Sequence, residues 1–187
     1  MTLQNDLKLY HGSYIEVSKP DLDKCADGKD FGKGFYLTTD IKQAQRFVRS
    51  SVGKAIKNGI RVEDSKKGFV SEFVLSFGKD LRIHEFADAD VEWLHCVAAH
   101  RRKALFPQEI SKWGDYDIIT GKIANDNTNQ VITAYINGLY GPVGTERADS
   151  TAISLLMPEK LTDQICFRTV KALNAIRFVK ADVYRIV

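Results

Sequence analysis

The sequence predicts a single-domain α+β protein, and three observations carry this prediction. The chain has 187 residues, of which 44% are hydrophobic and 27% charged, an ordinary balance for a globular domain with a buried core. Short apolar runs typical of strands alternate with segments whose apolar residues recur at helical spacing. No internal repeat, low-complexity tract or linker divides the chain, so we expect one domain over residues 1–187.

The first two strands flank a long loop. Residues 7–10 are an apolar run that we expect to end at a turn formed by His11-Gly12-Ser13, and residues 35–38 form the second strand. Residues 14–33 hold a proline, several glycines and mixed charges, which predicts a loop. Long loops in compact domains tend to be functional or disordered, so this loop is a candidate part of a site.

A helix and a hairpin follow the second strand. Asp40, with Gln43 three residues later, predicts an N-cap and a capping box, and Asn58-Gly59 ends the helix that they open. Residues 69–77 and 81–86 have strand composition, and the Gly-Lys-Asp turn between them predicts a hairpin. The residues expected on the inner face of the helix are Ile41, Ala44, Val48, Val52 and Ala55.

The second half of the chain alternates helices with strands. The expected helices run from Asp88 or Asp90 to about Lys103, from Asn125 or Asp126 to Gly141-Pro142, over residues 147–157, and onward from Thr169. The expected strands are residues 116–123, 164–167 and 179–187. The residues that these helices are expected to bury are Val91, Leu94, Val97, Ala98, Ile132, Tyr135, Ile136, Leu139, Val170, Leu173 and Ile176.

Composition argues against several classes of protein. Cys25, Cys96 and Cys166 have neither the number nor the spacing of a disulfide framework or a zinc site, so we expect reduced thiols and no metal. The N-terminus lacks a signal-peptide pattern, and no apolar run approaches the roughly 20 residues that span a bilayer. We therefore expect a cytoplasmic protein with no membrane partner. The net charge of +3 permits a nucleic-acid partner but does not argue for one.

The residues around the first two strands indicate a ligand. His11-Gly12 offers an imidazole beside an exposed peptide edge, and Gly12 has no Cβ to keep a ligand away. Such an edge can pair with a primary amide. Tyr36 and Phe47 can sandwich a flat heteroaromatic ring if the chain between them folds back. A flat ring with an amide describes nicotinamide, although each residue taken singly also fits a turn or a core position.

Two motifs together resemble a known family. Leu9-Tyr10-His11-Gly12-Ser13 and Phe31-Gly32-Lys33-Gly34-Phe35-Tyr36-Leu37-Thr38-Thr39-Asp40 resemble the NAD-binding motifs of ADP-ribosyltransferases, in the branch of diphtheria toxin and the poly(ADP-ribose) polymerases. Within this branch the chain is similar to a bacterial family of stand-alone proteins. The resemblance is strong over residues 7–48 and weaker over residues 116–126 and 164–178. It implies an ADP-ribosyltransferase-like fold: two small, mostly antiparallel sheets with flanking helices and an NAD cleft between them.

The resemblance also implies a role for each motif residue. His11 would bind a ribose hydroxyl, Gly12 would hold the carboxamide through its backbone, and Ser13 would contact a ribose hydroxyl. Tyr36 and Phe47 would stack on nicotinamide. The loop of residues 21–33 would lie over the adenine and the pyrophosphate, with Lys29 or Lys33 near a phosphate. The implied NAD-binding residues are His11, Gly12, Ser13, Lys33, Gly34, Tyr36 and Phe47.

Two departures from the family pattern matter. Ala44 stands where some members have a serine near the carboxamide, so one hydrogen bond is absent. The third motif residue, usually a glutamate at the start of a late strand, is matched by Gln164, which joins His11 and Tyr36 in the implied catalytic set. Glutamine cannot take a proton or supply negative charge, so we expect no poly-chain elongation. The other carboxylates considered are Asp163, on the opposite face of the strand, Asp126, Glu146 and Asp149.

The resemblance implies a NAD-dependent mono-ADP-ribosyltransferase, with NAD as co-substrate and a protein or nucleic acid as acceptor. By analogy it implies a bacterial toxin or defence effector, with a neutralising antitoxin as a further partner. One alternative is an NAD glycohydrolase, in which water is the acceptor. Another is a catalytically inactive NAD-binding or interaction module, which Gln164 keeps open.

A basic cluster, His100-Arg101-Arg102-Lys103, lies at the expected end of a helix. It either complements the helix dipole as a solvated end or docks an acceptor such as RNA or DNA. The basic residues that extend such a patch are Lys54, Lys57, Arg61, Lys66 and Lys67. We expect His84 and His95 to be structural.

Overall fold

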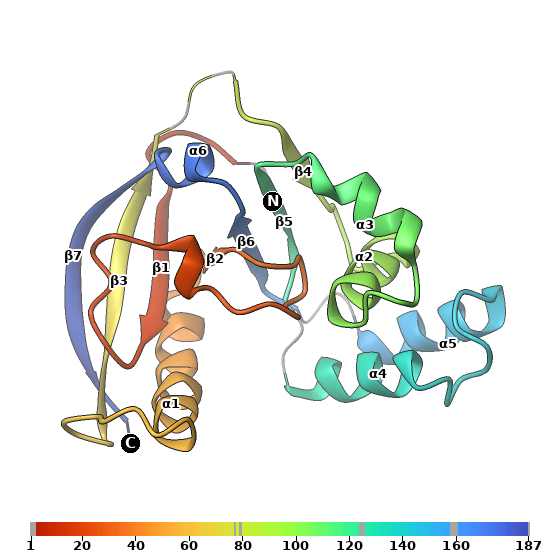
Figure 1. Cartoon of the computed structure of the whole chain (residues 1–187), viewed down its shortest axis with the longest axis horizontal. Coiled ribbons are helices and arrows are strands. Elements are labelled where there is room, and N and C mark those ends of the chain that lie inside the picture. The colour runs from red at the N-terminus through yellow and green to blue at the C-terminus, as the bar shows by residue number, and fades with distance from the viewer. Residues whose placement is uncertain (1–2, 77, 79, 124–125, 158–160, 187) are drawn as a thin grey trace.

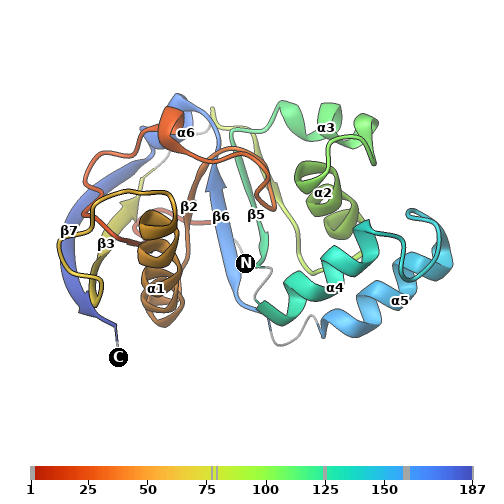
Figure 2. The ribbon, with the colours of Figure 1, turned by 60° about the horizontal axis from the view of Figure 1, so that its bottom comes forward.

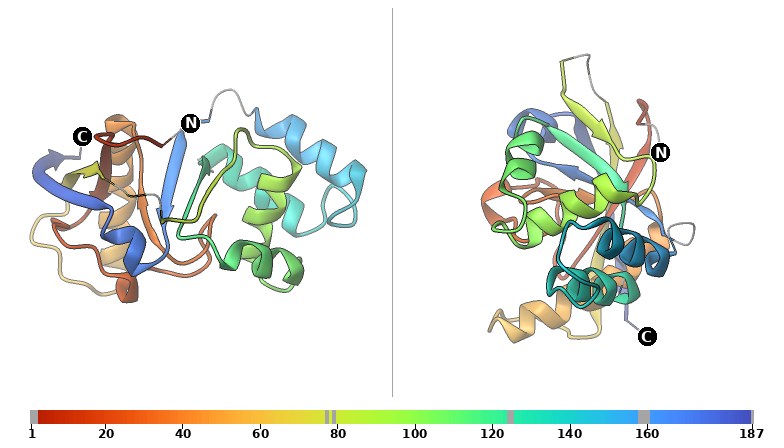
Figure 3. Two further views of the ribbon diagram at one scale, coloured as in Figure 1. Left: turned by 90° about the horizontal axis from the view of Figure 1, so that it is seen from above. Right: turned by 90° about the vertical axis from the view of Figure 1, so that its right-hand side faces the viewer.

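The protein is built in three layers. The structure is a computed structural model that describes residues 3–76, 78, 80–123, 126–157 and 161–186 (Figure 1). A three-stranded sheet with one helix on its face lies at one end, a four-stranded sheet lies in the middle, and a group of helices lies at the other end (Figures 2 and 3). The helices are α1 (Ile41–Lys57), α2 (Val91–Arg101), α3 (Pro107–Gly114), α4 (Asp126–Ile136), α5 (Glu146–Leu156) and the short α6 (Val170–Leu173).

The two sheets are small and mostly antiparallel. Sheet A has the order β1-β3-β7 and is antiparallel throughout, whereas sheet B has the order β2-β6-β5-β4, in which β4 and β5 run parallel. The strands are β1 (Lys8–Ser13), β2 (Phe35–Leu37), β3 (Lys67–Leu75), β4 (Ile83–Glu85), β5 (Ile118–Lys122), β6 (Asp163–Phe167) and β7 (Ile176–Arg185). The predicted α+β class with two small sheets is confirmed.

Three apolar clusters hold the layers together. The cluster between the sheets includes Leu9, Phe35 and Phe167, so its residues come from both sheets. A second cluster packs sheet B against α2, α4 and α5, and a third packs α1 against sheet A. Burial of these faces is the main favourable contribution to folding, because it removes apolar surface from water.

Strand β1 corrects the expected turn at His11-Gly12-Ser13. These residues continue the strand and pair with β3, with His11 opposite Ser71 and Ser13 opposite Phe69. The chain leaves the sheet only after Ser13. Between β1 and β2 the expected loop is present, with one 3₁₀ turn at Leu22–Lys24.

The expected hairpin of residues 69–77 and 81–86 is wrong. Strand β3 pairs with β1 and β7 in sheet A, whereas β4 pairs with β5 in sheet B. The turn between β3 and β4 therefore carries the chain from one sheet to the other. Strand composition marks both strands but says nothing of their partners, which lie far along the chain.

Most predicted helices are present, but several residues expected on their buried faces are exposed. Asp40, Asp90, Thr145 and Thr169 cap their helices through side-chain oxygens. The capping box is wrong, because the Gln43 side chain bonds to Thr162 Oγ1 and the Asp40 N–H donates to Thr38 Oγ1. Helix α3 was not predicted, and Asn125 lies outside the described residues, as does the side chain of Asp126. The residues expected inside but found exposed are Ile41, Val91, Leu139 and Val170, and Ile176 belongs to β7.

Neither a membrane-spanning helix nor a metal-ligating group of side chains is present among the described residues. Within those ranges no helix is long and apolar enough to cross a bilayer. In the same ranges no group of three or more histidine, cysteine, aspartate or glutamate side chains is arranged to hold a metal ion. All three cysteines are free thiols.

Candidate functional site

The two sheets meet where β1 approaches β2. The Tyr10 N–H donates to the Thr38 carbonyl at 2.8 Å, and the Thr38 N–H donates to the Tyr10 carbonyl at 3.1 Å. Main-chain groups of successive residues in an antiparallel strand point to opposite edges, so residues two apart share an edge. The N–H and C=O of Gly12 therefore point to the same edge as those of Tyr10, away from β3. In the described part of the chain neither group bonds to a loop or to a side chain.

Gly12 is required here for a reason that the sequence did not indicate. A Cβ at this position would lie 1.9 Å from the Ala44 carbonyl oxygen and 3.2 Å from the Val48 nitrogen, both in the backbone of α1. The missing side chain therefore lets helix α1 approach sheet A. The predicted role of Gly12 in holding a carboxamide concerns its main-chain N–H and C=O instead. The packing of α1 against the missing side chain leaves these two groups without a partner among the described residues.

His11 lies beside that edge with a defined tautomer. Its Nδ1 is 2.9 Å from the Tyr36 carbonyl oxygen, and because a carbonyl can only accept, Nδ1 carries the proton. The ring packs on Phe35, with centroids 4.6 Å apart. Burial lowers the pKa of His11, so the imidazole is neutral at pH 7 and Nε2 is an acceptor. Among the described residues Nε2 has no hydrogen-bond partner, and it is not fully buried, so a ligand can reach it.

Tyr36 and Gln164 share one face of sheet B. Tyr36 pairs with Cys166, and Gln164 lies two residues from Cys166 on β6, so the three side chains point to the same side. That side faces the cluster that includes residues of α2, α4 and α5. His11 contacts the main chain of Tyr36 rather than its ring. Tyr36 and Gln164 thus lie on adjacent strands of sheet B, and His11 lies on β1, which meets β2 at Tyr10 and Thr38.

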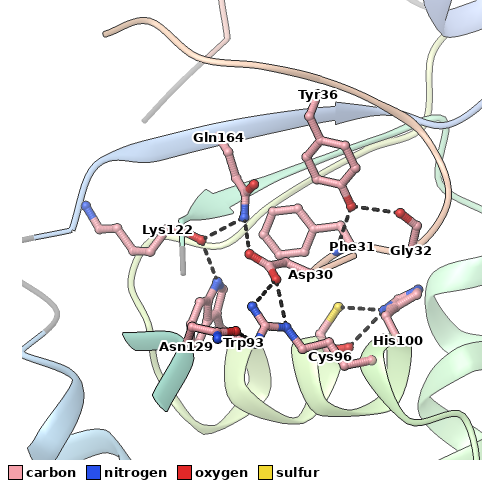
Figure 4. Close-up of polar contacts among 11 residues, drawn as sticks. Asp30, Phe31, Gly32, Tyr36, Trp93, Cys96, His100, Lys122, Asn129 and Gln164 are labelled. Carbon is pink, nitrogen blue, oxygen red and sulfur yellow. Dashed lines mark hydrogen bonds and ion pairs between the residues drawn. The ribbon is translucent and has the colours of Figure 1, made fainter. Parts of the chain in front are cut away.

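The hydroxyl of Tyr36 holds the preceding loop. It accepts from the Phe31 N–H at 2.9 Å and donates to the Gly32 carbonyl at 2.8 Å (Figure 4). Burial raises the pKa of the Tyr36 phenol well above its usual value, so the hydroxyl keeps its proton. Phe31 is fully buried and packs on Phe86, so this part of the loop belongs to the core.

Gln164 is a buried side chain at the start of β6, with 5% of its surface exposed. Its Nε2 donates to Asp30 Oδ2 at 2.8 Å and to the Lys122 carbonyl at 3.3 Å (Figure 4). Its Oε1 has no partner in the described residues and is not sealed from solvent. Gln164 therefore presents an acceptor to whatever lies in front of it.

Asp30 is the functional candidate that sequence reasoning missed. Its carboxylate is 8% exposed, and Oδ1 accepts from Arg101 Nε at 2.9 Å and from Nη2 at 2.6 Å. Arg101 Nη1 also donates to Asn129 Oδ1 of α4 at 2.7 Å. Asp30, not Asp149 or Glu146, is the carboxylate beside Gln164. Asp149 bonds to His95 and Tyr135, while Asp163 pairs with Lys122 Nζ at 3.2 Å.

The remaining predicted residues lie apart or have other roles. Phe47 is on the outer face of α1, 43% exposed, with Lys54 Nζ 5.5 Å above its ring. Ser13 is buried beside the Ile15 N–H. A Cβ on Gly34 would lie 2.4 Å from Cys166 Sγ, so Gly34 serves close packing on β6.

Two surface hollows lie away from these residues. One, of about 240 Å³, is lined by Lys33, His100 and Arg168 among others, and the second, of about 330 Å³, lies between residues 14–16 and 61–69. Neither includes His11, Tyr36 or Gln164. Lys33 therefore lines a hollow that includes none of the other predicted NAD-binding residues.

The residues of the basic cluster differ in exposure: His100 is buried and Arg101 is partly buried, whereas Arg102 and Lys103 are exposed. His100 is buried and its Nδ1 donates to the Cys96 carbonyl at 2.8 Å, while Arg101 pairs with Asp30. Arg102 donates to the Ile136 carbonyl, and Lys103 pairs with Asp27 at 3.7 Å. Arg101 lies apart from Arg102 and Lys103 because the buried carboxylate of Asp30 requires a cationic partner, which Arg101 supplies. Arg102 and Lys103 thus form a solvated helix end, and the docking of an acceptor there stays a prediction.

Comparisons with known proteins give a family but no activity. The model of the family described as "Protein of unknown function (DUF3990)" matches residues 7–178. This range contains both motifs and every strand of sheet B. A comparison with curated proteins found no match.

Proposed function

The chain belongs to the DUF3990 family, and we propose that it is a NAD-dependent mono-ADP-ribosyltransferase. The observation that carries the proposal is the junction of the two sheets. There the unpaired peptide edge of Gly12 lies beside the neutral His11, whose Nε2 has no described partner. An N–H and a C=O on one edge match the carboxamide of nicotinamide, and an imidazole acceptor matches a ribose hydroxyl.

Gln164 supports the proposal through hydrogen-bond polarity. Its Oε1 is an open acceptor on a neighbouring strand, and a ribose hydroxyl is a suitable donor for it. Together His11 and Gln164 would hold sugar hydroxyls, and the Gly12 edge would hold the amide.

In the transfer step the bond between the ribose C1′ and the pyridinium nitrogen breaks. Its electron pair stays on nitrogen, so nicotinamide leaves as a neutral molecule. The acceptor atom forms the new bond to C1′ and releases its proton to solvent, because an amide such as Gln164 cannot take it. The protein contributes by fixing the ring and the ribose in one orientation, which lowers the entropic part of the barrier.

Two alternatives share the site. A glycohydrolase uses water as the acceptor, and Gln164 offers no base to activate that water either. A binding module without chemistry is kept open by the same amide, which cannot take a proton. For the transferase, the proposed acceptor is a protein or a nucleic acid. The proposed role is that of a toxin or defence effector, which a second protein would neutralise.

The test is NAD turnover by the purified protein and by His11→Ala. We expect nicotinamide release in the wild type, and kcat/KM about fivefold to thirtyfold lower in the variant, because one hydrogen bond to the ribose is lost. The control is His84→Ala, since His84 is another histidine whose pKa burial lowers, packed on Trp113 and outside the site. Equal turnover in wild type and His11→Ala would contradict the assignment.

Labelled NAD incubated with a cell lysate separates the readings. Label on the protein or the nucleic-acid fraction, lost in His11→Ala, identifies a transferase and its acceptor class. Free nicotinamide without labelled macromolecule identifies the glycohydrolase. NAD binding without nicotinamide release identifies the inactive module, and no binding at all contradicts all three.

A further inference from the structure

A buried charge cluster lies behind Gln164. Asp30 of the loop accepts from Arg101 of α2 on one carboxylate oxygen and from Gln164 of β6 on the other (Figure 4). Arg101 and Gln164 are 71 and 134 residues from Asp30 along the chain. The cluster therefore joins three parts of the fold at one carboxylate.

We propose that Asp30 is a positioning residue that orients the Gln164 amide so that Oε1 faces the ligand. The proposal rests on the proposed function for the identity of that ligand. Asp30 fixes the amide from behind, and Gln164 supplies the contact with the ligand. The group that Gln164 meets must therefore be a donor, which selects a sugar hydroxyl over a carbonyl or phosphate oxygen.

The orientation follows from counting donors and acceptors. An amide nitrogen has two hydrogens, and those of Gln164 are directed to Asp30 Oδ2 and to the Lys122 carbonyl. The reversed amide would place Oε1 against both of these acceptors, which loses two hydrogen bonds and brings like partial charges together. Because the side chain is 5% exposed, water cannot replace the lost bonds on that side.

Arg101 makes the buried carboxylate possible. Two of its nitrogens contact Asp30 Oδ1, so the charge of Asp30 is balanced, and its third nitrogen is held by Asn129. The Tyr36 hydroxyl fixes the next two residues of the loop, Phe31 and Gly32. Asp30 is thus held from three directions, as a residue that orients another side chain needs to be.

The pair of Asp30 and Gln164 offers an exchange test. One carboxylate and one amide share a hydrogen bond, so Asp30→Asn with Gln164→Glu keeps that bond and the net charge while exchanging the two groups, and it loses only the bond to the Lys122 carbonyl. In Asp30→Asn alone, Arg101 keeps the amide oxygen on its side, so the amide nitrogen faces Gln164 and two donors oppose each other. The matched control is Asp163→Asn, which removes a carboxylate next to Gln164 that pairs with Lys122 instead.

The experiment measures nicotinamide release from NAD and thermal unfolding for Asp30→Asn, Gln164→Glu, the double variant and Asp163→Asn. We expect kcat/KM of Asp30→Asn to fall about tenfold to a hundredfold, as for the loss of a hydrogen bond to a charged group. The double variant should recover to within about threefold of the wild type, and Asp163→Asn should stay within the same range. Additive losses in the double variant, at equal unfolding temperatures, would overturn the proposal.

A second readout does not depend on catalysis. The side-chain amide hydrogens of Gln164, observed by ¹⁵N NMR, should exchange slowly in the wild type and Asp163→Asn but rapidly in Asp30→Asn. Rapid exchange in the wild type would overturn the role of Asp30 even if NAD is turned over. Slow exchange without any NAD binding would sustain the orientation by Asp30 and contradict the proposed function instead.

Discussion

Tyr36 makes two kinds of contact, one through its ring and one through its hydroxyl. The hydroxyl bonds hold the peptides of Phe31 and Gly32, and the ring packs against the cluster of sheet B and the helices. The predicted stacking on nicotinamide concerns the ring alone. The two roles are therefore separable by a substitution that keeps the ring.

Tyr36→Phe should lower the free energy of unfolding by about 1–3 kcal/mol, because the Phe31 N–H loses its partner in a buried place. Chemical denaturation measures this change. NAD affinity at a temperature where the variant is folded should change by less than about fivefold, because the ring remains. Tyr14→Phe is the control, since in the described residues no bond of the Tyr14 hydroxyl is present. Unchanged stability in Tyr36→Phe would contradict the loop-holding role.

At the scale of elements, the contact of β1 with α1 decides how close sheet A and its helix can lie. Gly12 meets the backbone of Ala44 and Val48, which cannot rotate away as a side chain can. Any Cβ at Gly12 must therefore displace the helix or the strand. The same helix carries Gly53, where a Cβ would meet no atom within 4 Å.

Gly12→Ala should destabilise the protein by about 3 kcal/mol, at the upper end of the usual range for overpacking. Gly53→Ala should instead stabilise it by about 0.5–1 kcal/mol, because alanine is the better helix former and the site is open. Urea unfolding of both variants measures the two changes. Equal effects of the same sign would show that the approach of α1 to β1 is not tight.

Periodicity and capping residues were enough to predict most elements but not their neighbours. Asp40 and Thr169 marked helix starts correctly, because a cap is a local arrangement of a side chain and the first turn. The partner of β3 was mispredicted, since pairing with β1 and β7 depends on faces buried in the whole fold. The continuation of β1 through His11 was missed for the same reason.

The site residues were predicted or missed for the same reason. His11, Tyr36 and Gln164 were identified through motifs, and they lie on β1, β2 and β6. Asp30 was not, because an aspartate in a glycine-rich loop has the composition of a turn and its partners lie 71 and 134 residues away. Only the buried arginine opposite it distinguishes it from an ordinary loop residue.

At the scale of the whole molecule, three partly or fully buried histidines link folding to pH. Burial lowers the pKa of His11, His84 and His100 below the usual value of 6.5. They belong to β1 of sheet A, β4 of sheet B and helix α2, so each of the three layers contains one. Between the lowered folded pKa and 6.5, the unfolded chain binds more protons than the folded one.

The unfolding temperature should therefore be constant above about pH 7 and fall as the pH drops below about 6.5. The free energy of unfolding should decrease by at most about 1.4 kcal/mol per pH unit for each histidine. Calorimetry between pH 8 and pH 5 measures this slope. His84→Gln should reduce the slope between pH 6.5 and 5, because one of the three linked groups is removed. A stability that rises on acidification through this range would contradict the neutral state of His11, and with it the Nε2 acceptor on which the proposed ribose contact depends.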